Sequence, residues 1–244
     1  MPTLTRVPAV VLAMGLAVGC GGPPDPVTVE VGVHRISIVI PDGWHRYDHG
    51  REQRLETSDG DIVLTDLGPV TAVGYRPVIA AAREHLREGR REDARQTLED
   101  LRRAPSIDAE DLWSAIDRSL DLCRTGRSTA DVEASLDAIL AEADRRSEPD
   151  LSSLASVSLA AFDHGPRRDI EREERRVLDG REARQIVTWQ RLTHDHRRWH
   201  LCVVDRGHLL VIRTTSGSDA VLGPAFDTVV RSLTFAETGL HGAR

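Results

Sequence analysis

The sequence predicts an α+β fold: a central antiparallel β-sheet flanked by helices, with an all-α helical segment inserted into it. Two observations lead to this expectation. Three short apolar runs follow one another between residues 183 and 214, separated by polar breaks, which is typical of an antiparallel meander. Apolar residues at helical spacing replace this alternation in residues 77–149. The chain therefore divides into a sheet domain, residues 31–76 and 150–236, and a helical insertion, residues 77–149.

The meander comprises Ala183–Leu192, Arg198–Asp205 and His208–Thr214. Only Arg206-Gly207 separates the last two runs, a length that suits a tight hairpin turn. Both alternating rows of the middle run are mostly apolar, which predicts a central strand covered on both faces. A helix is expected to begin at Pro224, because proline is favoured at a first helical position. Its apolar residues would pack on the sheet: Phe226, Val229, Val230 and Leu233.

Strands are also expected in residues 27–65, where Arg51–Thr57 and Asp61–Leu67 form a hairpin across an Asp-Gly turn. Leu151–Phe162 alternates in its second half and is interpreted as a return to the sheet. Gly165–Arg176 is dense in arginine and glutamate, and is interpreted as a solvated edge strand, a loop or a helix face.

The insertion divides into four predicted helices, near Val78–Glu88, Arg91–Arg103, Asp108–Arg124 and Thr129–Arg146. The first two helices resemble a single tetratricopeptide hairpin. No second copy of that pattern follows, and such solenoids need about three repeats for stability. A generic helical insertion is therefore favoured over a repeat array.

Residues 1–19 have the pattern of an export signal, with Arg6 followed by an apolar run that is short for a membrane span. The run ends in Leu16-Ala17-Val18-Gly19-Cys20. This resembles the lipobox of bacterial lipoproteins, although Ala17 stands where the consensus prefers leucine. The resemblance implies that Cys20 carries a diacylglycerol, and residues 20–30 would then be a lipidated tether. The alternatives are an ordinary secretion signal that is cut elsewhere and a cysteine that stands there by chance.

Both ends of the sheet domain resemble PsbP-like and DcrB-like proteins. Ile36–Trp44 matches their opening pattern of an apolar strand followed by Pro-x-Gly-Trp, and Val177–Ala183, the meander and Phe226–Phe235 resemble their closing half. The resemblance implies a central antiparallel sheet flanked by helices, and an exported lipoprotein. It brings no shared catalytic residues. The helical insertion departs from the compact family pattern.

Few residues suggest chemistry. The net charge is −7 and aromatic residues make up 4% of the chain, which argues against a nucleic-acid partner. His194 and His196 lie two apart in the polar loop Thr193–Arg197 and can share a metal ion, but solvated loop histidines are the favoured interpretation. Neither a nucleophile elbow nor a phosphate-binding loop is present in the sequence, and no cofactor is expected.

Two cysteines remain besides Cys20. Export would place Cys123 and Cys202 where disulfides form, so a bridge would clamp the insertion to the sheet. Two separate buried thiols are the alternative.

These observations favour a non-enzymatic, membrane-anchored exported lipoprotein, on the periplasmic or extracytoplasmic face, that binds a protein or cell-envelope component. A carrier of a small apolar or amphiphilic ligand and an unrecognised hydrolase are the rivals. An apolar cavity under the helices would favour the carrier, whereas an exposed apolar stripe on a filled insertion would favour the binding module.

Overall fold

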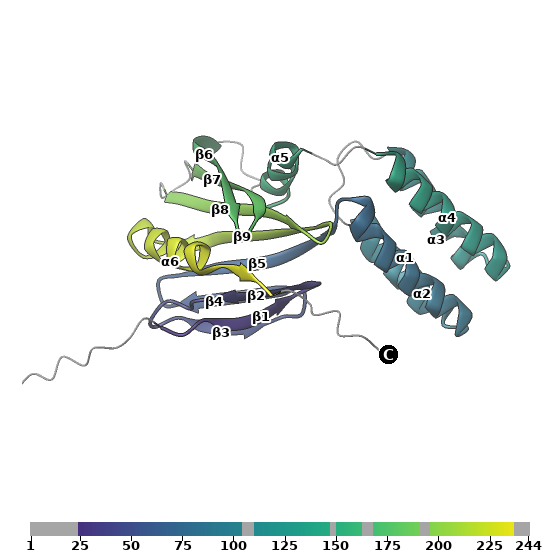
Figure 1. The fold of residues 1–244 in the computed structure, drawn as a ribbon, viewed down its shortest axis with the longest axis horizontal. Helices are drawn as coiled ribbons and strands as arrows, with labels where there is room; N and C mark the ends of the chain where they lie inside the picture. Colours follow the sequence, from purple (N-terminus) through teal and green to yellow (C-terminus); the bar gives the residue numbers. More distant parts are fainter. Residues whose placement is uncertain (1–23, 104–109, 147–149, 163–167, 191–195, 237–244) are drawn as a thin grey trace, which may run out of the picture.

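The computed structural model describes residues 24–103, 110–146, 150–162, 168–190 and 196–236. It confirms the α+β fold class. Two antiparallel sheets form the body of the molecule, and a helical arm projects from one end of it (Figure 1).

The larger sheet has the strand order β3-β4-β5-β9-β8-β7-β6, and all its neighbouring strands are antiparallel. Its strands are β3 (His45–Asp48), β4 (Glu52–Thr57), β5 (Gly60–Pro69), β6 (Arg168–Leu178), β7 (Arg181–Gln190), β8 (His196–Asp205) and β9 (His208–Gly217). The predicted β7-β8-β9 meander and the β4-β5 hairpin are both confirmed. Strand β8 is internal and buried on both faces, with Leu201 on one and Cys202 on the other.

Different elements cover the two faces of this sheet. On one face lie α6 (Asp219–Ser232) and a small sheet of β1 (Val27–Val31), β2 (His34–Ile38) and β10 (Thr234–Phe235). The largest hydrophobic core fills the space between them. On the other face lies α5 (Leu151–Phe162), which packs on β7 and β8 over a smaller core. The sheet is thus the middle layer of the body.

Several boundaries differ from the expectations. Residues 151–162 form a helix and not a strand, because Leu154, Ala155, Ser158 and Leu159 make one buried helical stripe. Helix α6 begins at Asp219 and contains Pro224, since the amides of residues 221 and 222 already bond to the Ser218 carbonyl and form the first turn. Strand β1 begins at residue 27, as the strand pattern of residues 27–65 predicts, so the end of the expected tether, residues 20–30, belongs to the sheet. The charged stretch contributes the edge strand β6, one of its three interpretations.

The arm is formed by α1 (Ala72–Arg87), α2 (Arg91–Arg103), α3 (Glu110–Arg124) and α4 (Thr129–Arg145). Helix α1 packs against both α2 and α4, and α3 packs against the same two helices, so the four close into a bundle. A closed bundle differs from the stacked pairs of a tetratricopeptide array. The arm has a hydrophobic core of its own, which includes Ile79, Leu98, Ile116 and Leu136.

The arm meets the body at two glycines. The Gly207 carbonyl, in the turn between β8 and β9, accepts hydrogen bonds from the amides of Val70 (2.7 Å) and Thr71 (3.2 Å), just before α1. A Cβ at Gly207 would lie 2.3 Å from the Gly74 nitrogen, and the φ of Gly207 is +76°. Only glycine fits both the backbone conformation and the space, so this turn fixes where the arm begins.

Candidate functional site

The sequence-predicted site residues do not gather in one place. Cys20 and His194 lie outside the described residues. His196 is the first residue of β8 and half-buried, so it belongs to a strand and not to the predicted loop. Within the described ranges, no group of three or more histidine, cysteine and acidic residues is arranged to hold a metal ion. The part of the chain that the structure describes also has no helix long and apolar enough to cross a membrane.

The bridge between Cys123 and Cys202 is not formed. Both thiols are free and buried, Cys123 in the core of the arm and Cys202 in the core beneath α5. This is the alternative that the sequence left open. Burial raises the pKa of Cys202 to about 12, with a hydrogen bond to Ser158 opposing the shift, so its thiol is unreactive at neutral pH.

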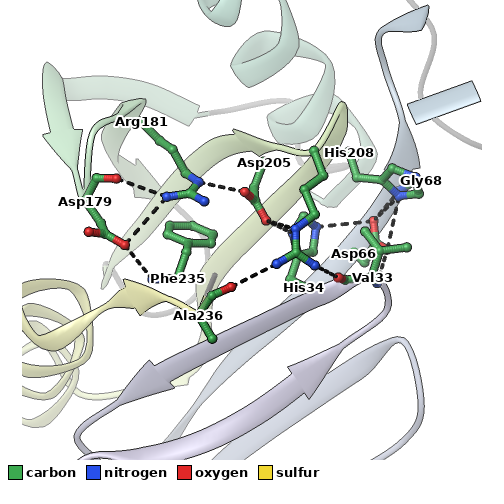
Figure 2. A network of polar contacts seen from close by, with 11 residues as sticks. Val33, His34, Asp66, Gly68, Asp179, Arg181, Asp205, His208, Phe235 and Ala236 are labelled. Atoms are coloured by element: carbon green, nitrogen blue, oxygen red, sulfur yellow. Dashed lines mark hydrogen bonds and ion pairs between the residues drawn. The ribbon is translucent and has the colours of Figure 1, made fainter. Parts of the chain in front are cut away.

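A buried cluster of charged side chains lies instead where the two sheets and the arm meet (Figure 2). We call it the junction network; it consists of His34, Asp66, Arg181, Asp205 and His208. The chain brings these residues together from the starts of β2, β7 and β9 and from the last parts of β5 and β8. The two histidines and two aspartates are each at most 6% exposed.

His34 lies between the two carboxylates. Its Nδ1 is 3.1 Å from Asp205 Oδ2, and its Nε2 is 3.6 Å from Asp66 Oδ1. A protonated imidazole can donate from both nitrogens, whereas a neutral one can donate from only one. The geometry therefore favours an imidazolium held between two carboxylates.

Asp66 is the most connected acid of the network. It accepts hydrogen bonds from the backbone amides of Val33 (3.2 Å) and Gly68 (2.8 Å), and His208 Nδ1 lies 3.3 Å from both of its oxygens. A Cβ at Gly32 would lie 2.0 Å from Asp66 Oδ2, so a glycine allows the β1–β2 turn to approach. One carboxylate thus joins the small sheet to the large one.

Two arginines extend the network to the last strand of the small sheet. Arg181 donates from Nε to Asp205 Oδ1 at 2.6 Å, and its guanidinium lies 4.2 Å from the centre of the Phe235 ring. Arg206 donates to the carbonyls of Val33 (3.0 Å), in the β1–β2 turn, and Ala236 (2.9 Å), just after β10. Both arginines therefore connect the large sheet to the small one.

The charges shift the acid–base equilibria of the network. Burial opposes protonation of His34, but the hydrogen bond to Asp205 and the nearby charge of Asp66 outweigh it and raise the pKa of His34 above its ordinary value. Burial likewise opposes ionisation of Asp66, yet its contacts with His208 and with His34 hold its pKa well below the usual range. The pKa of Asp205 is lowered against the same penalty by His34 and Arg181. The contacts therefore favour the charged forms of His34, Asp66 and Asp205.

These side chains are directed at one another and are withdrawn from solvent. Such an arrangement can fix the elements that carry it and respond to pH, because a buried charge is stable only while its partner is charged. It does not present an exposed nucleophile or general base to a substrate.

Sequence reasoning missed this network, although one signal was present. His34 lies in the inward row of β2 with Ile36 and Ile38, where an apolar residue would be usual. Its partners are spread over the chain as far as position 208, and no local spacing connects them.

Comparison with known proteins found no family model and no curated protein that matches this chain. Among solved structures, it is similar to the solution structure of cyanobacterial PsbP (CyanoP) from Synechocystis sp. PCC 6803. The TM-score is 0.41 and the identity 12%, over 91% of this chain and 99% of that one. Similarity at this level does not establish membership of a family.

The junction network predicts a stability optimum in mildly acidic solution. The raised pKa of His34 means that its contribution is complete below 6.5, the value for an unfolded histidine, and is lost as the pH rises through the folded value. The lowered pKa values of Asp66 and Asp205 mean that their contributions are complete above 3.8 and are lost on acidification. The free energy of unfolding should therefore fall on either side of this window, by up to about 1.4 kcal/mol per pH unit for each group.

Chemical denaturation across pH measures this profile. His34→Gln should abolish much of the decline above pH 6.5 and also weaken the acid limb, because His34 helps to lower the pKa of both aspartates. His45→Gln, at an exposed site in β3, should keep both limbs. The titration of the His34 imidazole by NMR in the parent protein gives an independent reading. A midpoint at or below 6.5 would contradict the account.

Proposed function

We propose that this chain is an exported lipoprotein, held at a bacterial membrane through Cys20, whose folded body binds a protein or cell-envelope component without catalysing a reaction. The observation that supports it most is the position of the arm. It projects from the end of the body opposite to the end where β1 begins (Figure 1).

The tether would keep the start of β1 close to the bilayer. Six residues lie between Cys20 and Val27, and the seven steps from one Cα to the next span at most about 25 Å when the chain is fully extended. An anchor at that end of the body leaves the arm directed away from the lipid surface. A projecting bundle with its own core is suited to recognition, because its outer face can vary without disturbing the sheet.

The surface of the arm indicates what it would contact. The apolar stripe that would favour a binding module over a carrier is not present among the described residues of the arm, since the only large apolar side chain that they expose is Val73. A groove of about 430 Å³ lies instead between α3 and α4, where Ala134 and Ala138 leave room beside Leu122. Two arginines, Arg118 and Arg127, and one aspartate, Asp131, also line it, so positive charge is in excess. This combination suits an apolar side chain that is flanked by an acidic group.

The anchor is tested by replacing its thiol. Cys20→Ser should move the protein from the membrane fraction to the soluble fraction, because the serine cannot take the thioether-linked lipid. Mass spectrometry of the parent should find acyl chains on the peptide that begins at Cys20. A Cys20→Ser protein that remains on the membrane would contradict the anchor.

The arm is tested by filling its groove. The variant with Ala134→Arg and Ala138→Arg should lose the protein partners that the intact lipoprotein retains when it is purified from membranes. Ala220→Arg, at an exposed site on α6, is the matched control and should retain them. Mass spectrometry of the bound proteins and lipids measures the outcome.

Two results would oppose this assignment. If the parent, the arm variant and the Ala220→Arg control all retain the same proteins, the arm is not the recognition surface. If a small amphiphile is recovered with the parent and the arm variant loses no protein, the result would favour the rival function, a carrier of a small ligand.

A further inference from the structure

The arginines of the arm are engaged within the molecule, with two exceptions. Most form ion pairs with acidic side chains of the same bundle. Arg91 donates instead to two backbone carbonyls, those of Leu122 and Arg127. The exceptions are Arg118 in α3 and Arg127 in the α3–α4 turn, whose guanidinium groups donate to no other described residue.

These two arginines line the same groove, the one of about 430 Å³ between α3 and α4. The hydrogen bond between Ser119 and Ser135 (2.7 Å) places Arg118 beside the second turn of α4, whereas Arg127 precedes the first turn. Helices rise 1.5 Å per residue, so the two arginines stand about 10 Å, or two turns, apart along the groove. The half-buried Leu122, one turn after Arg118, lies between them.

The neighbouring acidic side chains are engaged elsewhere. Asp131, which also lines the groove, accepts a hydrogen bond from the Ser128 hydroxyl (2.7 Å), and Ser128 in turn caps α4. Asp117 precedes Arg118 in the sequence but pairs with Arg102 at 2.9 Å. Positive charge therefore remains in excess along the groove, and a negatively charged partner complements it.

The walls of the groove determine the backbone conformation that fits it. Both walls are helices, which satisfy their backbone hydrogen bonds internally, and the buried Ser135 hydroxyl is already bonded to Ser119. An extended segment would find no backbone partners here, and its own amides and carbonyls would be left unpaired on burial. A helix pairs its own backbone groups and needs only side-chain contacts. The small side chains of Ala134 and Ala138, one turn apart, leave room for its approach.

A lipid surface fits these observations less well. Basic segments that hold anionic headgroups have about four to eight lysines or arginines close together. The groove has two, and α3 and α4 together carry more acidic than basic residues. The arm also projects from the end of the body opposite to the proposed anchor (Figure 1).

We propose that the α3–α4 groove binds an acidic amphipathic helix of a partner protein. Two carboxylates at positions i and i+7 of that helix, about 10 Å apart, pair with Arg118 and Arg127. An apolar side chain at position i+3 or i+4, on the same face, packs on Leu122. This inference rests on the proposed binding function of the arm and specifies the segment that the arm recognises.

Photo-cross-linking identifies the segment that occupies the groove. Benzoylphenylalanine in place of Ala138, in the intact lipoprotein irradiated in its membranes, should attach to a partner segment with this spacing of acidic and apolar residues. Mass spectrometry of the cross-linked peptide gives its sequence. Benzoylphenylalanine in place of Ala220, which is exposed on α6, is the matched control and should not attach to that segment.

Charge exchange tests the two arginines. A synthetic peptide of the cross-linked segment should bind the full chain carrying Cys20→Ser and become helical, as circular dichroism measures. Arg118→Glu together with Arg127→Glu should weaken binding about a hundredfold or more, because like charges then face each other. A peptide whose two acidic residues are replaced by arginine should bind this double variant and not the parent.

The outcomes separate this inference from the proposed function. If Ala134→Arg with Ala138→Arg loses no protein, the arm is not the recognition surface and both fail. If that variant does lose a protein, three results would overturn the acidic helix alone: no cross-link at position 138, a cross-linked segment without the acidic spacing, or binding that charge exchange leaves unchanged. Binding of the Cys20→Ser chain to phosphatidylglycerol vesicles, abolished by the two glutamates, would overturn it in favour of a lipid surface.

Discussion

The four-residue turn Asp205-Arg206-Gly207-His208 is the constraint on which the rest of the structure depends. Its two outer side chains enter the junction network, where Asp205 meets His34 and His208 meets Asp66. Arg206 donates to the carbonyls of Val33 and Ala236 in the small sheet. The Gly207 carbonyl accepts hydrogen bonds from the amides of residues 70 and 71, which lead into the arm. One hairpin therefore connects three parts of the molecule: the larger and the small sheet, which share one hydrophobic core, and the arm, which has its own.

The free-energy cost of burying charges explains which residues make up the junction network. Charges taken out of water are stable only when every partner is present, so removing one member of a buried pair commonly costs about 3–5 kcal/mol. His34 supplies the positive charge that the two carboxylates need beyond Arg181, and this is why its pKa is raised against burial. The hydrophobic cores determine that the layers pack, and the network determines how they are aligned. The same charges make the alignment sensitive to pH.

Local patterns predicted most of the fold and little of the junction network. The β8–β9 turn and the four arm helices were recognisable because their signals, a two-residue turn and helical spacing, lie within a few residues. Residues 151–162 were misassigned because alternating serines and small apolar residues fit either period, and packing on β7 and β8 decided for a helix. The network joins His34 to Asp205 across 171 positions, so only the folded chain shows it. The two-residue turn was predicted from the sequence. The close approach of the Gly74 backbone to Gly207, which leaves no room for a side chain at Gly207, was not.

Two matched glycines allow the most direct test of the turn as the junction. Gly180 and Gly207 both have a φ of +76° and both end two-residue hairpin turns, but a Cβ at Gly180 meets nothing within 4 Å. The measurement is hydrogen exchange together with the free energy of unfolding for Gly207→Ala and Gly180→Ala. Both variants should lose about 1–2 kcal/mol through the backbone conformation. Gly207→Ala should lose about 1–3 kcal/mol more through the clash, with reduced protection in α1 and in the β1–β2 hairpin. Equal costs, or a loss of protection confined to the turn itself, would contradict the account.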